Sequence, residues 1–372
     1  ITRVEARVTW EDVDKAPLAL FVETKAEFQQ GLWPDPNAFL IGCLLPAWRA
    51  GERRVRVDGY LCPILRHNLK AALDTLQLWY PDFFGPMPVI ETTRGFKARL
   101  PAQGQAVSLL SCGIDSLATL RRNKLYLPSD HPAAIRGVIV MKFDRDPEPS
   151  LEALSAMAWG RLQAVTEVAE DSGVDPIPVR TNIWWLANDG YFSDEKWHGA
   201  ILSSIACFFS KRFQKAYIAS ADDIAHQTPW GAHPSLDPYY SSAHFQIEHH
   251  GVDMSRFQKT ALVADWPIAL QNIRVCQRDE SGTRNCGSCE KCIKTTVALL
   301  ALGKLKGSGS FPRDDVSIRI LNLIEEYDMI HGEHQVDQYK EVIPALRKRG
   351  RDELADTIRK ILVAYAEKQS KK

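Results

Sequence analysis

The chain has 372 residues, of which 45% are hydrophobic and 25% are charged, as in ordinary globular domains. Lys plus Arg number 46 and Asp plus Glu number 46, whereas chains that bind long nucleic acids usually carry a positive excess. We therefore expect two or three domains without an extended tRNA or DNA footprint. The sequence lacks a long apolar run and a basic-then-apolar start, so neither a membrane span nor a signal peptide is expected.

Residues 1–100 predict an α+β domain for recognition or dimerisation. Val4, Ala6, Val8 and Trp10 alternate with polar residues, as in a half-buried strand. Prolines and a polar run shortly before residue 100 indicate the boundary of this domain. The other elements that the pattern predicts here are strands at 18–22 and 53–58 and helices at 37–48 and 63–79.

Residues 101–270 alternate between strands, which are almost entirely apolar, and helices. This alternation predicts an α/β domain with a parallel sheet covered on both faces. Ligands of such sheets bind beyond the carboxyl ends of the strands. The expected strands are 105–110, 137–143, 174–181 and 215–220, and the expected helices are 115–124, 150–170 and 197–210.

The first of these strands runs into Ser111-Cys112-Gly113-Ile114-Asp115-Ser116, at the start of a helix. Gly113 permits a positive φ and a close approach of the backbone, and the backbone N–H groups of such a turn form a cradle for phosphate oxygens. Ser111 and Ser116 add hydroxyl donors, while Asp115 either holds Mg²⁺ or caps the helix. No lysine follows, so this is not the G-x-x-x-x-G-K-[ST] loop of ordinary NTPases.

This stretch resembles the S-G-G-x-D-S signature of the PP-loop ATP pyrophosphatases. The resemblance implies an adenine-nucleotide α-hydrolase-like fold and cleavage of ATP between its α- and β-phosphates. Cys112 stands where glycine is usual in this signature. If this position takes a positive φ, the side chain costs about 1 kcal/mol. Cys112 is then either a tolerated small residue or, as the alternative, a reactive thiol. Asp144, after the second strand, is expected near ribose or Mg²⁺. The expected ATP-binding residues are Ser111, Cys112, Gly113, Ile114, Asp115, Ser116, Lys142 and Phe143.

Four of the eight cysteines, Cys276, Cys286, Cys289 and Cys292, follow the pattern Cys-x9-Cys-x2-Cys-x2-Cys within residues 271–312. Four thiolates predict a closed tetrahedral Zn²⁺ site of structural type, with Gly287 permitting the turn. A redox dithiol and an iron–sulfur cluster are the alternatives, although no Cys-Pro follows the last cysteine. A metal site in place of disulfides predicts a reducing, cytoplasmic location.

A four-cysteine knuckle after a PP-loop domain resembles 7-cyano-7-deazaguanine synthases over about residues 105–300. The resemblance implies adenylation of 7-carboxy-7-deazaguanine, followed by attack of a nitrogen nucleophile, and it aligns residues 255–265 with the lysine-containing segment of that family. The helical tail 313–372 lies outside the resemblance, and its residues Leu354, Ile358, Ile361, Leu362 and Tyr365 share one apolar face. The expected catalytic residues are Asp115, Arg256, Lys259 and His198, although exposed helix charges and a capping or core histidine give the same pattern.

The segment 220–242, which follows the fourth strand, is too long for a routine connection and mixes aromatic residues with His and Asp. Trp230, Tyr239 and Tyr240 are candidates to stack on a planar heterocycle, with Asp222, His233 and Asp237 bonding its edge. A surface loop or a dimer contact is the alternative for this segment.

Three enzyme classes fit these motifs. The first makes an amide or nitrile from ammonia. The second transfers the deazaguanine to a protein amine, as in the synthase-like enzymes attached to CBASS antiviral operons, with a partner such as a nucleotidyltransferase. The third thiolates tRNA, which the neutral charge disfavours. A non-catalytic nucleotide-binding module is a fourth possibility, and Cys112 is its best support. The additional residues 1–100 favour a protein acceptor, with homodimerisation the alternative.

Overall fold

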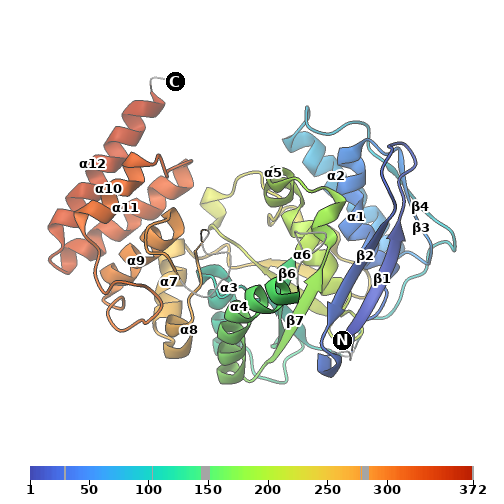
Figure 1. Ribbon diagram of the computed structural model, residues 1–372, viewed down its shortest axis with the longest axis horizontal. Helices are drawn as coiled ribbons and strands as arrows, with labels where there is room; N and C mark the ends of the chain where they lie inside the picture. Colours follow the sequence, from blue (N-terminus) through green and yellow to red (C-terminus); the bar gives the residue numbers. More distant parts are fainter. Residues whose placement is uncertain (29–30, 103, 144–150, 277, 279–284, 371–372) are drawn as a thin grey trace.

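A computed structural model describes residues 1–28, 31–102, 104–143, 151–276, 278 and 285–370, with residues 151–160 described by their backbone alone. Asp144 therefore lies outside the described residues. Figure 1 shows a central sheet, with the first helices of the chain at one end of the molecule and the last three helices at the other.

The central sheet has seven strands in the order β1-β2-β7-β6-β5-β8-β9, and the last five are parallel to one another. The prediction of an α/β fold with a mostly parallel sheet is confirmed. β5 lies between β6 and β8, so the chain changes direction across the sheet at β5, and ligands bind at such switch points. The strands are β1 (Thr2–Val8), β2 (Leu18–Thr24), β5 (Ala106–Leu109), β6 (Ile135–Phe143), β7 (Asp175–Thr181), β8 (Lys215–Ala219) and β9 (Gln246–His250).

The buried strands contribute alternate side chains to two cores, because successive residues of a strand point to opposite faces. In β6, Val138 and Val140 belong to one core and Ile139 to the other. The first core contains α3 (Ile114–Tyr126) and the later helices, and α4 (Leu151–Ser172) packs against this face through residues such as Val165. The second core contains α1 (Pro36–Ala50), α2 (Pro63–Trp79) and α6 (His198–Cys207).

Residues 1–100 share the second core with the sheet. The hairpin of β1 and β2 extends the central sheet, since β2 pairs antiparallel with β7. Ser204 Oγ of α6 donates a hydrogen bond of 2.8 Å to the Ala38 carbonyl of α1. A second, two-stranded parallel sheet is formed by β3 (Arg54–Val57) and β4 (Val89–Thr92). The N-terminal segment therefore has a small sheet of its own but is continuous with the α/β half of the chain.

Asp35, which is fully buried, ties α1 to residues far along the chain. It caps α1 by accepting from the Asn37 N–H (3.0 Å), and it also accepts from Arg99 (3.2 Å), Ser210 (3.3 Å) and His244 (3.3 Å). Burial alone would raise the pKa of Asp35, but the hydrogen bonds from His244 and Asn37 and the Arg99 charge lower the pKa overall. The carboxylate is therefore the form that the folded state favours.

Asp35→Ala should lower the free energy of unfolding by about 3 kcal/mol or more, because it leaves several buried donors without an acceptor. Since the pKa of Asp35 is lowered in the folded state, its stabilisation is present above the unfolded pKa and is lost as pH falls through the folded pKa. Urea denaturation measures the effect. Asp74→Ala, which breaks the exposed Lys70–Asp74 pair, is the control and should cost less than about 0.5 kcal/mol. Equal losses in both variants would contradict this role of Asp35.

The helix predicted at 197–210 starts earlier than expected. The chain forms a helical turn at α5 (Gly190–Phe192), then a π-helical turn, η3 (Ser193–Trp197), and α6 follows directly. π-Helical turns are frequent at functional sites. The remaining short helices are η1 (Ala26–Phe28), η2 (Ile183–Leu186), η4 (Ile224–His226) and η5 (Asp237–Tyr240).

The C-terminal third is helical. The expected apolar face of the tail is confirmed, since Leu354, Ile358, Ile361 and Leu362 are buried and Tyr365 packs against the same core. The helices are α7 (Arg256–Ala264), α8 (Pro267–Gln271), α9 (Glu290–Leu302), α10 (Ile318–Glu326), α11 (Glu333–Lys348) and α12 (Asp352–Gln369).

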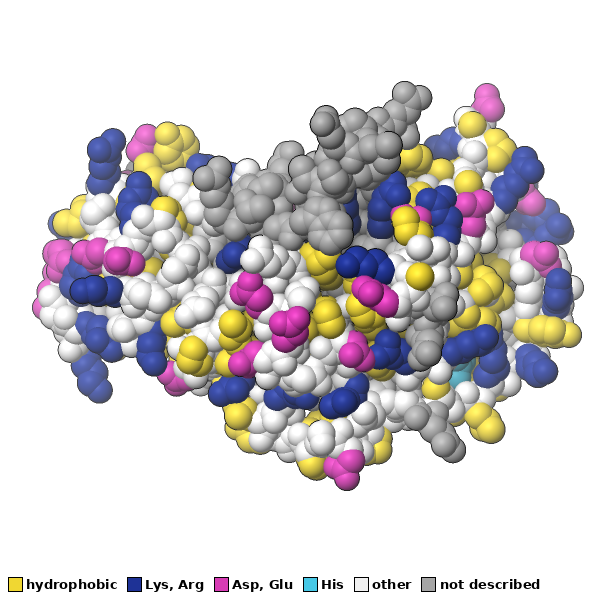
Figure 2. All heavy atoms as spheres, turned by 60° about the horizontal axis from the view of Figure 1, so that its bottom comes forward, with side chains coloured by type: hydrophobic (Ala, Val, Ile, Leu, Met, Phe, Trp, Pro, Cys, Tyr) yellow, Lys and Arg dark blue, Asp and Glu magenta, His cyan; other side chains and the backbone are white. Residues whose placement is uncertain are grey.

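Charges of both signs are mixed on the surface, and Figure 2 shows Lys and Arg side chains interspersed with Asp and Glu over one face. This mixture agrees with the equal numbers of basic and acidic residues in the sequence. Among the helices in the described part of the chain, none is both long enough and apolar enough to cross a bilayer.

Candidate functional site

The loop between β5 and α3 has its positive φ at Cys112, where φ is 57°, while Gly113 has a φ of −73°. The positive φ that a glycine permits is not used at Gly113, which takes the extended conformation of an N-cap residue. Cys112 adopts a left-handed conformation that costs a side chain about 1 kcal/mol. Burial raises the pKa of the Cys112 thiol to about 12, which favours a packed thiol over a reactive thiolate.

The hydroxyls of this loop hold it in a compact turn. Ser116 Oγ donates to the Gly113 carbonyl (3.0 Å) and lies 3.3 Å from Ser111 Oγ, which accepts from the Gly113 N–H at 3.3 Å. Gly113 has no side chain with which to cap α3, so the N–H groups of the first turn are not capped locally. A helix N-terminus of this kind favours an anion through its N–H groups and its dipole.

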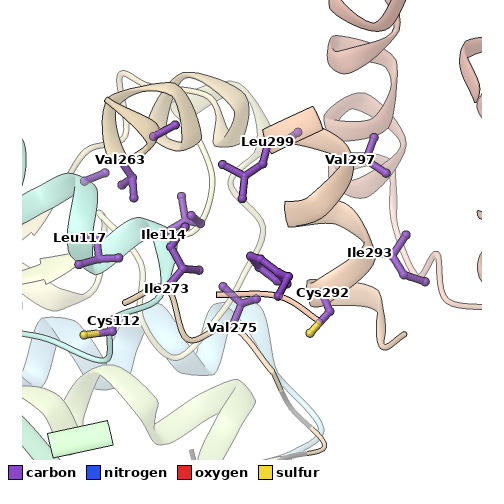
Figure 3. Packing of buried hydrophobic residues seen from close by; sticks show 14 of the residues in the cluster. Cys112, Ile114, Leu117, Val263, Ile273, Val275, Cys292, Ile293, Val297 and Leu299 are labelled. Carbon is purple, nitrogen blue, oxygen red and sulfur yellow. The ribbon is translucent and has the colours of Figure 1, made fainter. Parts of the chain in front are cut away.

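The segment that begins the cysteine cluster is joined to the loop. The Arg274 N–H donates to the Cys112 carbonyl at 2.8 Å. Figure 3 shows Ile114 of α3 beside Ile273, and Val275 between Ile273 and Cys292; all four are buried in the same core. The conformation of the loop therefore depends on the position of residues 273–275.

The four predicted metal ligands come together. The Sγ atoms of Cys276, Cys286, Cys289 and Cys292 all lie within 4.8 Å of one another, close enough to bind one metal ion. Gly287 has a φ of 72°, as the expected turn requires, and a Cβ there would also contact Pro312. The N–H groups of Ser288 and Cys289 donate to Cys286 Sγ at 3.4 and 3.3 Å, which orients this sulfur toward the others.

Asn285, which no sequence motif identifies, connects this cluster to the loop. Its Oδ1 accepts from the Val275 N–H at 2.9 Å, and its Nδ2 donates to the carbonyls of Ile273 (2.9 Å) and Ser310 (2.7 Å). Because Asn285 directly precedes Cys286, a displacement of the cysteines would be transmitted to residues 273–275.

α7 brings two of the expected catalytic residues to the start of α3. Arg256 Nη1 bonds Asp115 Oδ2, and Lys259 Nζ donates to the Ser220 carbonyl at 2.9 Å. Burial lowers the pKa of Lys259, and the nearby Asp115 charge opposes this shift. Asp115 Oδ1 is buried and has no hydrogen-bond partner among the described residues. Carboxylate oxygens are ligands that Mg²⁺ prefers in proteins, so Asp115 fits the predicted Mg²⁺ ligand by its chemistry.

A pocket of about 490 Å³ adjoins the Asp115–Arg256 pair. It is lined by residues of the segment after β8, of the start of α7 and of α11 in the predicted tail. The structure thus brings together Asp115, Arg256, Lys259 and Asp222 of the predicted site. The side chains that form its walls include Asp222, His226, Arg256, Asp337, Gln338 and Glu341.

A second group of predicted residues surrounds Asp237, which is fully buried. Asp237 Oδ2 lies 2.7 Å from Nδ1 of His249, a residue of β9 that no sequence motif identifies, and Oδ1 accepts from the His233 N–H at 3.3 Å. His198 lies nearby. Burial lowers the pKa of His198, and the charges of Asp194 and Asp237 oppose this shift.

The three aromatic candidates of this loop lie in different environments. Tyr240 is 2% exposed and packs in the second core, whereas Trp230 is 40% and Tyr239 is 36% exposed. Trp230 and Tyr239 therefore have a surface available for stacking, and Tyr240 does not.

The loop after β8 rests on the N-terminal segment. Tyr80 donates its hydroxyl to the Pro229 carbonyl at 2.8 Å, and Asn68 of α2 donates to the Ser241 carbonyl at 2.9 Å. Trp79 meets the His233 ring edge-on, with 4.7 Å between the centroids. Residues 1–100 therefore support the loop that carries the candidate substrate-binding residues.

Lys142 and Phe143 lie at the carboxyl end of β6, on the same sheet edge as the loop after β5, because the two strands are parallel neighbours. Phe143 packs against Trp184 with 6.0 Å between ring centroids. Both side chains are partly exposed. Their role toward ATP remains a prediction.

We compared the chain with models of protein families, with curated proteins and with solved structures, and no match was found in any of the three.

His226 joins the pocket walls, since its Nδ1 lies 2.7 Å from Asp223 and its Nε2 lies 3.0 Å from Asp337 of α11. The hydrogen bond with Asp223, followed by that with Asp337, raises the pKa of His226. Its contribution to docking of α11 is therefore complete below the unfolded pKa and is lost as pH rises through the folded pKa.

His226→Gln should remove this pH dependence. Between pH 6 and pH 8, the melting temperature of the native protein should fall more than that of His226→Gln. The effect of losing a histidine elsewhere is measured in His67→Gln and is subtracted before the comparison. His67 is an exposed residue of α2 and serves as the control. Identical pH profiles for all three proteins would contradict this role of His226 between Asp223 and Asp337.

Proposed function

We propose that the chain uses ATP to adenylate a carboxylate, releasing pyrophosphate, and that a nitrogen nucleophile then displaces AMP. The observation that carries this proposal is the loop 111–116 at the switch point of the sheet, where the uncapped start of α3 faces Arg256 and Lys259. This arrangement suits a leaving pyrophosphate, because N–H donors, a helix dipole and two cations converge on it.

In the proposed reaction, a carboxylate oxygen of the substrate attacks the α-phosphorus of ATP, and the bond to the β-phosphate bridging oxygen breaks. Arg256 and Lys259 neutralise the charge of the departing pyrophosphate, and the N–H groups of α3 orient it. Mg²⁺ held by Asp115 with ATP would supply further positive charge. The nucleophile then attacks the acyl carbon of the adenylate and expels AMP. The substrate we propose, 7-carboxy-7-deazaguanine, rests on the resemblance to 7-cyano-7-deazaguanine synthases.

We propose Zn²⁺ for the four-cysteine site. Four thiolates leave no open position on a tetrahedral ion, so the metal would be structural and would hold Asn285 and residues 273–275 in place. It would thereby support the nucleotide loop without taking part in the reaction.

The proposed reaction is tested by incubating the purified chain with Mg-ATP and 7-carboxy-7-deazaguanine, with and without ammonium. With ammonium present, AMP and pyrophosphate should form in equal amounts and only when the carboxylate is present, and mass spectrometry should detect the amide. Conversion of the amide to the nitrile removes its oxygen and therefore requires a second adenylation, so the nitrile should appear with two ATP consumed per product. ADP and inorganic phosphate as products would contradict the proposal, because they require attack at the γ-phosphorus.

The contact between α2 and the loop 220–242 favours a protein amine as a second candidate for the nucleophile. Trp79, Tyr80 and Asn68 touch this loop, so an acceptor bound to the N-terminal segment would lie next to the site. Intact-mass measurement of candidate partner proteins, in the presence of ATP and 7-carboxy-7-deazaguanine, tests this candidate. Full turnover with ammonia alone, with no protein gaining mass, would exclude it.

A further inference from the structure

The central sheet has one covered edge and one open edge. At β9, the Ile247 N–H donates to Ser241 Oγ at 2.9 Å, so the residues after η5 cover the outer side of this strand. At the other end of the sheet, β1 pairs only with β2 (Figure 1). Among the residues that the structure describes, none makes a backbone hydrogen bond to the outer side of β1. A strand of seven residues is therefore open to pairing with another strand.

We propose that β1 pairs with β1 of a second copy of this chain, antiparallel and around a two-fold axis at Ala6, so that the two central sheets form one continuous sheet. The inference goes beyond the proposed reaction and does not depend on it. Backbone hydrogen bonds are available to any added strand, so the side chains of the strand determine which partner fits.

The side chains of β1 divide between the two faces of the sheet. Val4 is buried in the second core and Val8 packs against it. Arg3, Glu5 and Arg7 are exposed on the opposite face. Charged residues on an edge strand usually prevent pairing. In β1 the charge alternates in sign along the exposed face, so the strand is complementary to a reversed copy of itself.

Both faces of the strand match when Ala6 is on the axis. Glu5 of each copy then lies opposite Arg7 of the other, and the symmetry forms this ion pair twice. On the apolar face, Val4 of each copy lies opposite Val8 of the other. Opposite charges and branched apolar side chains that face each other across two strands stabilise the pairing.

The neighbouring registers fit less well. With Glu5 on the axis, Arg3 would face Arg7 and the two Glu5 side chains would face each other, which is unfavourable. With Val4 on the axis, Arg3 would face Glu5, but Arg3 already binds the buried Glu23 at 2.6 Å. Arg7 has no ion-pair partner among the described residues and is therefore available to Glu5 of a second copy.

The proposed symmetry leaves each candidate site complete in its own chain. The two-fold axis is perpendicular to the sheet and reverses the direction of the strands in the second copy. The carboxyl ends of the parallel strands, where the loop 111–116 lies, are therefore on opposite edges of the continuous sheet.

Sedimentation velocity on the full chain, over about 1 to 100 μM protein, tests the inference, and the native chain should sediment as a dimer at the upper concentrations. Glu5→Arg leaves arginines at both positions of the pair, and Arg7→Glu leaves glutamates at both. Each variant should raise the dissociation constant of the dimer at least about ten-fold, because like charges then face each other twice. The double variant Glu5→Arg/Arg7→Glu exchanges the two charges and should return to within about three-fold of the native value.

An equimolar mixture of the two single variants provides a second test of the register. The mixed pair has arginines on one chain and glutamates on the other, so the mixture should dimerise although each variant alone does not. Arg136→Glu is the matched control, since it makes the same charge change at an exposed residue of β6, inside the sheet, and should keep the native dissociation constant.

Three results would overturn the inference. One is a native chain that is monomeric over the whole concentration range. Another is a dimer that neither Glu5→Arg nor Arg7→Glu weakens, because its interface would lie elsewhere. The third is a mixture of the single variants that stays monomeric, because the two charges would then not face each other. Recovery of the dimer in the double variant would show that the charge changes leave the fold intact.

Discussion

Cys289→Ser should release the metal from the four-cysteine site and unfold the segment around it. The native protein should contain one metal ion per chain by elemental analysis, and the variant should contain none. Metal binding by four thiolates is worth about 10 kcal/mol or more in small zinc domains, so Cys289→Ser should destabilise the chain more than Asp35→Ala does. Thermal denaturation should show a lower melting temperature and a less cooperative transition.

The same substitution should weaken the proposed ATP binding, although Cys289 does not belong to the loop 111–116. Asn285 links the cysteines to residues 273–275, and the Arg274 N–H holds the Cys112 carbonyl at 2.8 Å. Cys112 needs such support because its φ of 57° is unfavourable for a residue with a side chain. Removing the metal from the native protein with a chelator should therefore raise the dissociation constant for Mg-ATP about ten-fold or more.

Cys43→Ser is the control for this experiment. Cys43 is a partly buried cysteine of α1, remote from the cluster, so its replacement should leave metal content and ATP binding unchanged. A variant with all four cysteines replaced by serine that is folded, metal-free and unchanged in ATP affinity would contradict both the structural role and the coupling.

The secondary structure is predictable wherever apolar periodicity is strong. The nearly all-apolar strands and the amphipathic tail appear where the pattern predicts them, because a fully buried strand or a half-buried helix needs those residues. The cysteine cluster is predictable for another reason, since its four members are close together in the sequence. The extension of the sheet by β1 and β2 is not predictable, because pairing of β2 with β7 joins residues about 160 positions apart.

The site is harder to predict, for reasons that specific residues show. Glycine tolerates a positive φ best, which favours Gly113 for that conformation, but Gly113 serves as the N-cap and the strain falls on Cys112. Asp237 and Tyr240 have the composition of a binding loop, yet packing against α6 and β9 buries them. Gln338 carries no local signal at all, because only the docking of α11 brings it to Asp222.

Asp115→Ala should reduce pyrophosphate release by at least about 10³-fold, if the reaction is the proposed attack on the α-phosphorus. Two losses combine in this variant. The proposed Mg²⁺ ligand is removed, and Arg256 loses the carboxylate that positions it at the start of α3. Because a transition state with charge on the leaving pyrophosphate depends on both, the turnover number should fall far more than the affinity for ATP.

Asp253→Ala is a closely matched control because, like Asp115→Ala, it removes an aspartate that pairs with an arginine. Asp253 pairs with Arg122 near the other end of α3, and its side chain is 58% exposed. This variant should keep pyrophosphate release near the native rate, because an exposed ion pair contributes little and lies away from the loop. The assay follows pyrophosphate with saturating 7-carboxy-7-deazaguanine over a range of Mg²⁺ concentrations. Equal rates for Asp115→Ala and Asp253→Ala would contradict the proposed mechanism. If the rate of Asp115→Ala recovers at high Mg²⁺, the effect is assigned to metal binding rather than to the position of Arg256.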